Sequence, residues 1–134
     1  MDLDRAPFVM NFFFFPCPLI STYNTNIDLS FSLHLTYLDL SFNAFTGSFP
    51  SFLSNLHHLV YLDLSENKFT GQIPNVFDRL TNLQSLGLWD NNFQRKLPSS
   101  LFALTQLSSL DCSNNEIEGP LPDKNFHEAK ITLH

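Results

Sequence analysis

The chain has 134 residues, of which 43% are apolar and 15% are charged, and its formal net charge is −6 at neutral pH. These proportions are typical of one globular domain and exclude collagen-like, low-complexity and wholly disordered chains. Seven Lys and Arg against thirteen Asp and Glu leave no basic patch for a nucleic-acid backbone. We therefore expect no nucleic-acid partner.

The segment 1–26 forms an apolar leader without any repeat. Its most apolar run, residues 8–20, is interrupted by one Asn and two Pro, and it is shorter than the roughly 20 apolar residues of a membrane-spanning helix. We expect no membrane span in this chain. The run has the length of a secretory signal, but early aspartates oppose the positive start and no small-residue cleavage site follows. Two alternatives stay open: a degenerate signal, or a leader that is disordered or packs on the core.

The following part of the chain repeats itself with a constant period. Four units begin, without insertions between them, at Leu35, Leu59, Leu83 and Leu107, so equivalent positions recur every twenty-four positions. Each unit opens with alternating apolar and polar residues, as in Leu38–Ser41, which is the pattern of a short strand with one buried face. Such a strand cannot bury its apolar face alone, so we expect the units to stack as a parallel solenoid. The leucines that should lie side by side in it are Leu38, Leu62, Leu86 and Leu110.

Each unit continues with a fixed order of residue types. An Asn supplies an amide for the backbone groups of the turn, and we predict this structural role for Asn43, Asn67, Asn91 and Asn115. A large apolar residue two positions later should fill the core. A Gly then marks a crowded position or one of positive φ, where Arg95 in unit three costs on the order of 1 kcal/mol if its φ is positive. Beyond a Pro, apolar residues recur at every third position, which suits a 3₁₀ or short helical segment on the convex side.

The two ends of the array are expected to differ from its middle. Residues 27–31 imitate the start of a strand but lie out of register, so they form either a collapsed repeat or an improvised cap. In unit four, Asn125 and Glu128 stand where the other units have apolar residues, so residues 124–134 should fray. The predicted organisation is a leader over 1–26, a repeat array over 27–123 and a frayed end.

The repeat pattern resembles the plant-specific class of leucine-rich repeat. Three units carry its Gly-x-hydrophobic-Pro element, at Gly47–Pro50, Gly71–Pro74 and Gly119–Pro122, and the stretch LDLSENKFTGQIP is similar to ectodomains of plant receptor-like proteins. The resemblance implies an α/β fold in which a right-handed solenoid forms a horseshoe arc with one short parallel strand per repeat. It also implies an extracellular or plasma-membrane-associated protein that perceives a protein, peptide or glycan ligand, has a possible co-receptor, and signals in processes such as defence.

Exposed strand positions of such a solenoid form columns along its concave face, and a ligand can bridge several units there. The four columns are Tyr37, Tyr61, Ser85 and Ser109; Asp39, Asp63, Gly87 and Asp111; Ser41, Ser65, Trp89 and Ser113; and Phe42, Glu66, Asp90 and Asn114. Exposed aromatic side chains give a large contact area at low entropic cost. The predicted ligand-binding residues are Tyr37, Phe42, Tyr61, Glu66, Trp89 and Asp90. The alternative for the aromatics is packing against neighbours on the sheet surface.

The sequence offers little support for catalysis or metal binding. Asp39 and Asp63 would lie roughly one strand spacing apart, but Asp recurs in three of the four units as a structural position does, so we expect no enzyme activity. His57 and His58 have no carboxylate or Cys at ligand spacing, and Cys112 replaces a core Leu. We expect neither a metal nor a cofactor.

The leading interpretation is a non-catalytic recognition module that forms part of a plant receptor-like ectodomain. Two alternatives remain. One is a secreted inhibitor of pathogen wall-degrading enzymes, similar to the polygalacturonase-inhibiting repeat proteins. The other is a non-functional gene fragment of marginal stability, because four units only just exceed the minimum of about three that a solenoid needs.

Overall fold

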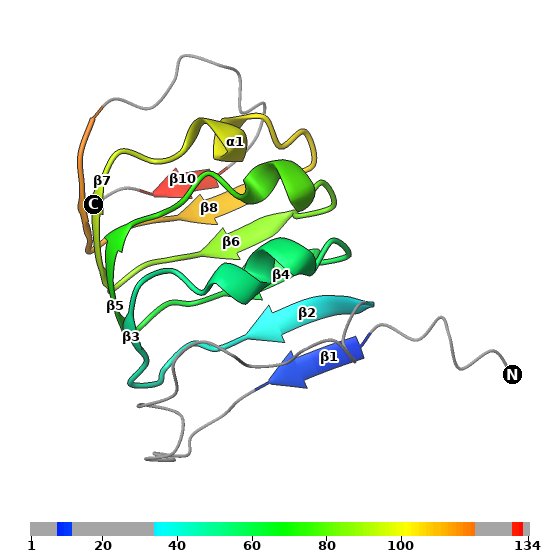
Figure 1. Cartoon of the computed structure of the whole chain (residues 1–134), viewed down its shortest axis with the longest axis horizontal. Coiled ribbons are helices and arrows are strands. Elements are labelled where there is room, and N and C mark those ends of the chain that lie inside the picture. The colour runs from blue at the N-terminus through cyan, green and yellow to red at the C-terminus, as the bar shows by residue number, and fades with distance from the viewer. Residues whose placement is uncertain (1–7, 12–33, 120–129, 133–134) are drawn as a thin grey trace, which may run out of the picture.

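The computed structural model describes residues 8–11, 34–119 and 130–132, and it winds residues 34–119 into a solenoid of stacked units (Figure 1). The larger of its two sheets has the strand order β1-β2-β4-β6-β8-β10, at Phe8–Asn11, Leu35–Asp39, Tyr61–Asp63, Ser85–Gly87, Ser109–Asp111 and Lys130–Thr132. The smaller has the order β3-β5-β7-β9, at Thr46–Gly47, Lys68–Gln72, Asn92–Arg95 and Glu116–Ile117. The helical turns are η3 Ser51–Asn55, η4 Phe77–Arg79 and α1 Ser99–Phe102.

The larger sheet stacks the strands of successive units in parallel and in register. Leu38 pairs with Leu62, Leu62 with Leu86, and Leu86 with Leu110, and all four side chains are buried. The constant period makes this register possible, because a one-residue slip would turn the apolar face of a strand outward. The predicted solenoid and its row of leucines are confirmed.

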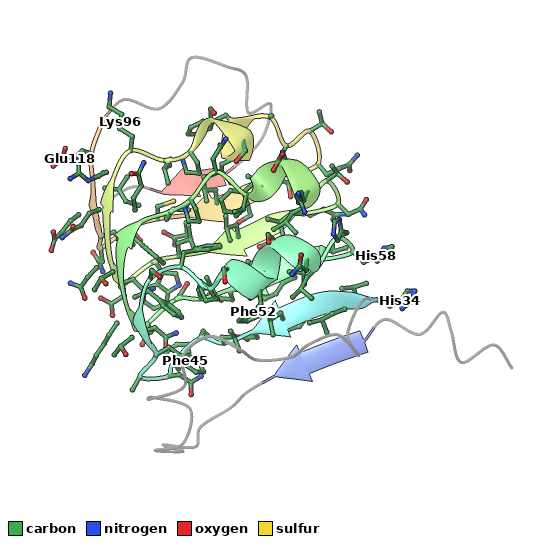
Figure 2. All side chains as sticks on the ribbon, viewed as in Figure 1. His34, Phe45, Phe52, His58, Lys96 and Glu118 are labelled. Carbon is green, nitrogen blue, oxygen red and sulfur yellow. The ribbon has the colours of Figure 1, made fainter. Side chains whose placement is uncertain are left out.

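The convex segments close the core from the opposite side. Each helical turn buries one face through the apolar residues spaced three apart, and the predicted 3₁₀ or short helical geometry is confirmed. The buried residues of these segments are Leu53, Leu56, Leu59, Phe77, Leu80, Leu83, Leu101, Leu104 and Leu107. Figure 2 shows Phe52 on η3, one of the side chains that pack against this core from its edge.

The smaller sheet adds a second strand to each unit, which the sequence analysis did not predict. Its strands follow the repeated Asn by one to three residues, and the large apolar column lies in them at Phe69, Phe93 and Ile117, with Phe45 directly before β3. Phe69 and Phe93 are buried, and their rings stack with centroids 6.0 Å apart. Phe45 and Ile117 are only partly buried, since each has a described neighbouring unit on one side. The expectation that this column fills the core therefore holds fully for the middle units.

The repeated Asn side chains link each unit to the one before it. Asn67 donates through Nδ2 to the carbonyls of Leu40 at 2.9 Å and Leu64 at 3.0 Å, and its Oδ1 accepts from the N–H of Phe45 at 3.0 Å. Asn91 and Asn115 make the corresponding bonds one and two units further along. Buried turn carbonyls and N–H groups that the sheets leave free thus find partners.

The Gly column adopts the left-handed backbone conformation. Gly47, Gly71 and Gly119 have φ values of +88°, +79° and +93°, and Arg95 takes the same position with φ of +65°. The strain expected at Arg95 is therefore present, because a side chain at positive φ costs on the order of 1 kcal/mol. Arg95 nevertheless stays in β7 and pairs with Ile117 of β9.

Both ends of the larger sheet carry strands outside the repeats. β1 pairs in parallel with β2, and β10 with β8. Residues 8–11 and 130–132 thus form strands, while the predicted division into leader, array and frayed end stays a prediction. Each covers backbone groups that an edge strand would leave unpaired. Residues 27–31, Asn125 and Glu128 lie outside the described residues.

Replacing Asn67 by Ala should destabilise the fold by about 3 kcal/mol, because buried carbonyls and an N–H group lose their partners. Urea unfolding followed by circular dichroism measures the change. Asn92→Ala removes an exposed amide from β7 and should leave the midpoint almost unchanged. Equal midpoints for the two variants would show that the Asn bonds contribute nothing net.

Arg95→Gly should stabilise the fold by about 1 kcal/mol, because Gly adopts positive φ without strain. Gly71→Ala should act in the opposite direction by a similar amount. A Cβ at Gly71 meets no atom within 4 Å, so the backbone conformation alone is tested. Thermal melts of both variants check the pair, and a lower melting temperature for Arg95→Gly would contradict the interpretation.

Candidate functional site

The candidate site is the outward side of β2, β4, β6 and β8, here called the strand face. It is the face predicted to be concave, and its residues are the four predicted columns. Figure 2 shows Phe45, Lys96 and Glu118 along the side of the smaller sheet and Phe52 on the helical turn η3. The helical-turn side carries a separate open groove of about 610 Å³, lined by Gln72, Ile73, Pro74, Asn75, Leu97, Pro98 and Ser99. None of those lining side chains is ionisable.

The first column pairs two tyrosines. The rings of Tyr37 and Tyr61 stack with centroids 4.2 Å apart and an interplanar angle of 3°. The Tyr61 hydroxyl donates to Asp63 Oδ2 at 3.2 Å. Burial, followed by the nearby Asp63 carboxylate, raises the pKa of Tyr61 well above its ordinary value. The tyrosines therefore pack on each other, as the alternative interpretation holds, while both stay partly exposed.

The second and third columns form a repeated hydrogen-bonding motif. Asp39 Oδ1 accepts from the backbone N–H and the hydroxyl of Ser41, at 2.9 and 2.6 Å. Asp111 does the same for Ser113, at 3.0 and 2.6 Å. The prediction that the serines of the third column are exposed is wrong, because Ser41, Ser65 and Ser113 are all buried. The aspartates occupy the structural positions that the sequence analysis predicts for them.

Units two and three interrupt this motif. Asp63 accepts from the N–H of Ser65 at 2.9 Å, but Ser65 Oγ has no hydrogen-bond partner among the described residues, although Ser65 is fully buried. In unit three, Gly87 and Trp89 replace the Asp and the Ser. A Cβ at residue 87 would lie 2.5 Å from Asp63 Oδ1 and 2.9 Å from Ser65 Oγ. The Asp63 carboxylate therefore fills the space that a side chain at residue 87 would need.

The fourth column lies on a tight turn after each strand. Phe42, Glu66, Asp90 and Asn114 all have positive φ, between 50° and 55°. The turn imposes this conformation on Phe and Glu, which rarely adopt it, so residue type alone did not predict it. Phe42 is 52% exposed, and its ring meets that of Trp89 edge to face at 6.2 Å. Because these residues come from units one and three, their rings meet across unit two.

The strand face is acidic. Asp39, Asp63, Glu66, Asp90 and Asp111 lie on it, and none of the positions described on β2, β4, β6 and β8 or their following turns carries Lys or Arg. Partial desolvation, together with the charges of Asp90 and Asp63, raises the pKa of Glu66 above its ordinary value. The six predicted ligand-binding residues thus form one surface of aromatic rings and uncompensated carboxylates.

The histidines and the cysteine of the described residues make weaker candidates for a functional site than the strand face does. The rings of His34 and His58 stack 5.4 Å apart where β2 and β4 begin (Figure 2). Within the described ranges, no group of three or more His, Cys, Asp or Glu is arranged to hold a metal ion. Cys112 is buried, and its burial and Asp111 raise its pKa to about 12, so it is the small core residue that the sequence predicts. Among the same residues, no helix has the length and apolarity needed to cross a membrane.

The repeat architecture and its sequence pattern define a family. A leucine rich repeat model matches residues 34–93, and a second leucine rich repeat model matches residues 106–124. The chain belongs to the leucine-rich-repeat family. No curated protein matches it significantly.

The chain is similar in sequence and fold to solved ectodomains of plant receptors. The ectodomain of the receptor kinase SOBIR1 from Arabidopsis thaliana is 33% identical, with a TM-score of 0.67, over 74% of this chain and 55% of that one. The ectodomain of the Arabidopsis receptor kinase HAESA, solved with an extended IDA peptide hormone, is 35% identical, with a TM-score of 0.67, over 75% and 17%. A plant ice-binding protein is 32% identical, with a TM-score of 0.60, over 63% and 27%. The chain thus spans about half or less of each matched protein.

Replacing Glu66 by Gln should raise the melting temperature at pH 7, because ionised Glu66 is disfavoured beside Asp90 and Asp63. A raised pKa means that the native state holds the proton more tightly, so stability falls as pH rises through that pKa. The advantage of the variant should therefore shrink as the pH is lowered from 7 to 4. Glu118→Gln, on an exposed residue near the smaller sheet, serves as control. A difference that does not depend on pH would refute this electrostatic account.

Proposed function

We propose that this chain is the ligand-recognition part of a plant receptor ectodomain and that a peptide binds across its strand face. The observation that carries the proposal is the exposed contact of Phe42 with Trp89, bordered by Glu66 and Asp90. Large, partly exposed aromatics beside polar groups are the residues that dominate binding energy at interfaces. The peptide complex of the HAESA ectodomain supports a peptide over other ligands.

Binding of this kind requires only non-covalent contacts and no chemical reaction. Strands roughly 4.8 Å apart place equivalent side chains in rows, and an extended peptide crossing them meets a new unit at each step. The Tyr37 and Tyr61 stack offers a flat apolar surface, and Trp89 with Phe42 offers a second. Glu66 and Asp90 lie beside the second surface and supply hydrogen-bond acceptors. The six residues predicted from the sequence thus take complementary roles in one proposed interface.

The biological setting belongs to the same proposal. We place the chain in the extracellular part of a plasma-membrane receptor that acts with a co-receptor and signals in defence. The fold by itself does not determine this role, since an ice-binding protein shares it. The side chains of the strand face are what favour peptide recognition over the other uses of the solenoid.

Selection from a random peptide library displayed on phage tests the proposal. Wild-type protein should enrich peptides that the double variant Tyr61→Ala and Trp89→Ala binds at least about tenfold more weakly, because two aromatic contacts are lost. Circular dichroism should show that the double variant keeps its fold. His57→Ala, at an exposed residue of a convex segment, is the matched control and should bind like wild type.

Two outcomes would refute the proposal. One is enrichment of peptides that bind the double variant and wild type equally, which would place binding elsewhere. The other is saturable inhibition of a fungal polygalacturonase without any peptide enrichment, which would favour the inhibitor class instead.

A further inference from the structure

Two histidines at equivalent positions of the repeat lie side by side where the strands of the larger sheet begin. His34 directly precedes unit one and His58 directly precedes unit two. Both side chains are exposed, and Figure 2 shows them near each other at the edge of the molecule. Their ring centroids lie 5.4 Å apart, with an interplanar angle of 17°. The sequence sets His57 beside His58 along the chain, whereas the fold sets His34 beside His58 in space.

Hydrogen bonds fix the backbone around this histidine pair. The N–H of Val60 donates to the carbonyl of Thr36 at 2.8 Å, which joins the residue before β4 to β2. Asn82 donates through Nδ2 to the carbonyl of His57 at 3.4 Å, which ties the turn before His58 to the next copy of that turn. Two ligands on a fixed backbone lose less conformational freedom when they bind an ion than two ligands on a flexible one.

The separation of the two rings suits one metal ion between them. A zinc ion lies about 2.0–2.1 Å from an imidazole nitrogen, and therefore about 3.2 Å from the centroid of the ring. Two rings that bind one ion at a tetrahedral angle have centroids about 5.2 Å apart. The 5.4 Å between His34 and His58 is close to this value. The last torsion of a His side chain is broad, so each exposed ring can turn a nitrogen toward a common point.

The composition around the pair favours a cation of this kind. Residues 34–60, which contain both histidines, include no Lys or Arg, and the whole chain has a formal net charge of −6. Imidazole is the commonest metal ligand in proteins, and it suits zinc, copper and nickel rather than calcium or magnesium. The pair thus offers nitrogen ligands to a transition metal without a cation of its own unit to repel it.

We propose that His34 and His58 together bind one divalent transition-metal ion, and that copper(II) binds most tightly. Copper(II) has the highest place in the order of affinities that nitrogen sites show for divalent first-row metals. No group of three or more metal-binding side chains occurs among the described residues, so water or a donor group of a partner completes the coordination. The pair lies outside the six residues of the proposed peptide interface, so the inference is independent of the proposed function.

Titration with copper(II) chloride in a calorimeter tests the site. His34→Ala and His58→Ala should each weaken binding at least about tenfold, because the ion then keeps one imidazole instead of two. His57→Ala removes a neighbouring exposed histidine and is the matched control, which should bind like wild type. His127 and His134, whose side chains lie outside the described residues, are replaced by Ala in every protein compared, so that they add no background.

Pulsed electron paramagnetic resonance of the copper(II) complex counts the imidazoles bound to the ion. The protein with both histidines should show two, and each single variant should show no more than one. Equal affinities and equal spectra for the three proteins would overturn the site, because copper would then bind elsewhere. A loss of binding in His57→Ala as large as in His34→Ala would also contradict the proposed pair.

Thermal melts separate the histidine pair from the acidic strand face. Zinc chloride should raise the melting temperature, because an ion that binds the native pair stabilises the fold, and the rise should be smaller in His34→Ala. Without metal, this variant should melt like wild type, since the side chain that it removes is exposed. Magnesium prefers oxygen ligands, so magnesium chloride is the control. An equal rise with magnesium, or with zinc in His34→Ala, would assign the ion to carboxylates instead.

Discussion

The hydrogen bonds of the repeated Asn side chains hold this solenoid in register. Asn67 and Asn91 each bind backbone groups of two successive units, so no unit can shift along its neighbour without leaving buried polar groups unpaired. The leucine rows supply most of the favourable free energy through apolar burial, but burial alone is non-directional. The amides make the stacking specific, and they thereby fix the spacing between equivalent side chains on the strand face.

Because the strand face repeats regularly, the positions where the repeat is interrupted are informative. The Asp and Ser motif recurs in units one and four with nearly equal distances, so its interruption at Gly87 and Trp89 is a local change on an unchanged backbone. The scaffold tolerates the interruption because the side chains of this face contribute little to the core. Ligand chemistry can therefore vary at this position without altering the fold.

The constant period of the sequence was enough to predict the solenoid, the leucine row and the convex segments, since each follows from apolar spacing. It did not predict the second sheet, because the Gly within several of those short strands favours a turn. The positive φ at Phe42 and Glu66 also escaped prediction, since neither residue type favours it. The sequence placed the aromatics and acids on one face, but the burial of the serines and the crowding of Asp63 and Ser65 around Gly87 depend on distances between units, which a linear pattern does not contain.

The absence of insertions between the units affects how the number of units can change in evolution. Because each junction presents the same amide contacts, unequal crossing-over within the gene that duplicates or deletes a whole unit creates no junction that is chemically new. The number of units can then change among descendants without altering the junctions between units, as long as about three units remain. A lineage can thus lengthen or shorten its exposed surface faster than it could invent a different architecture.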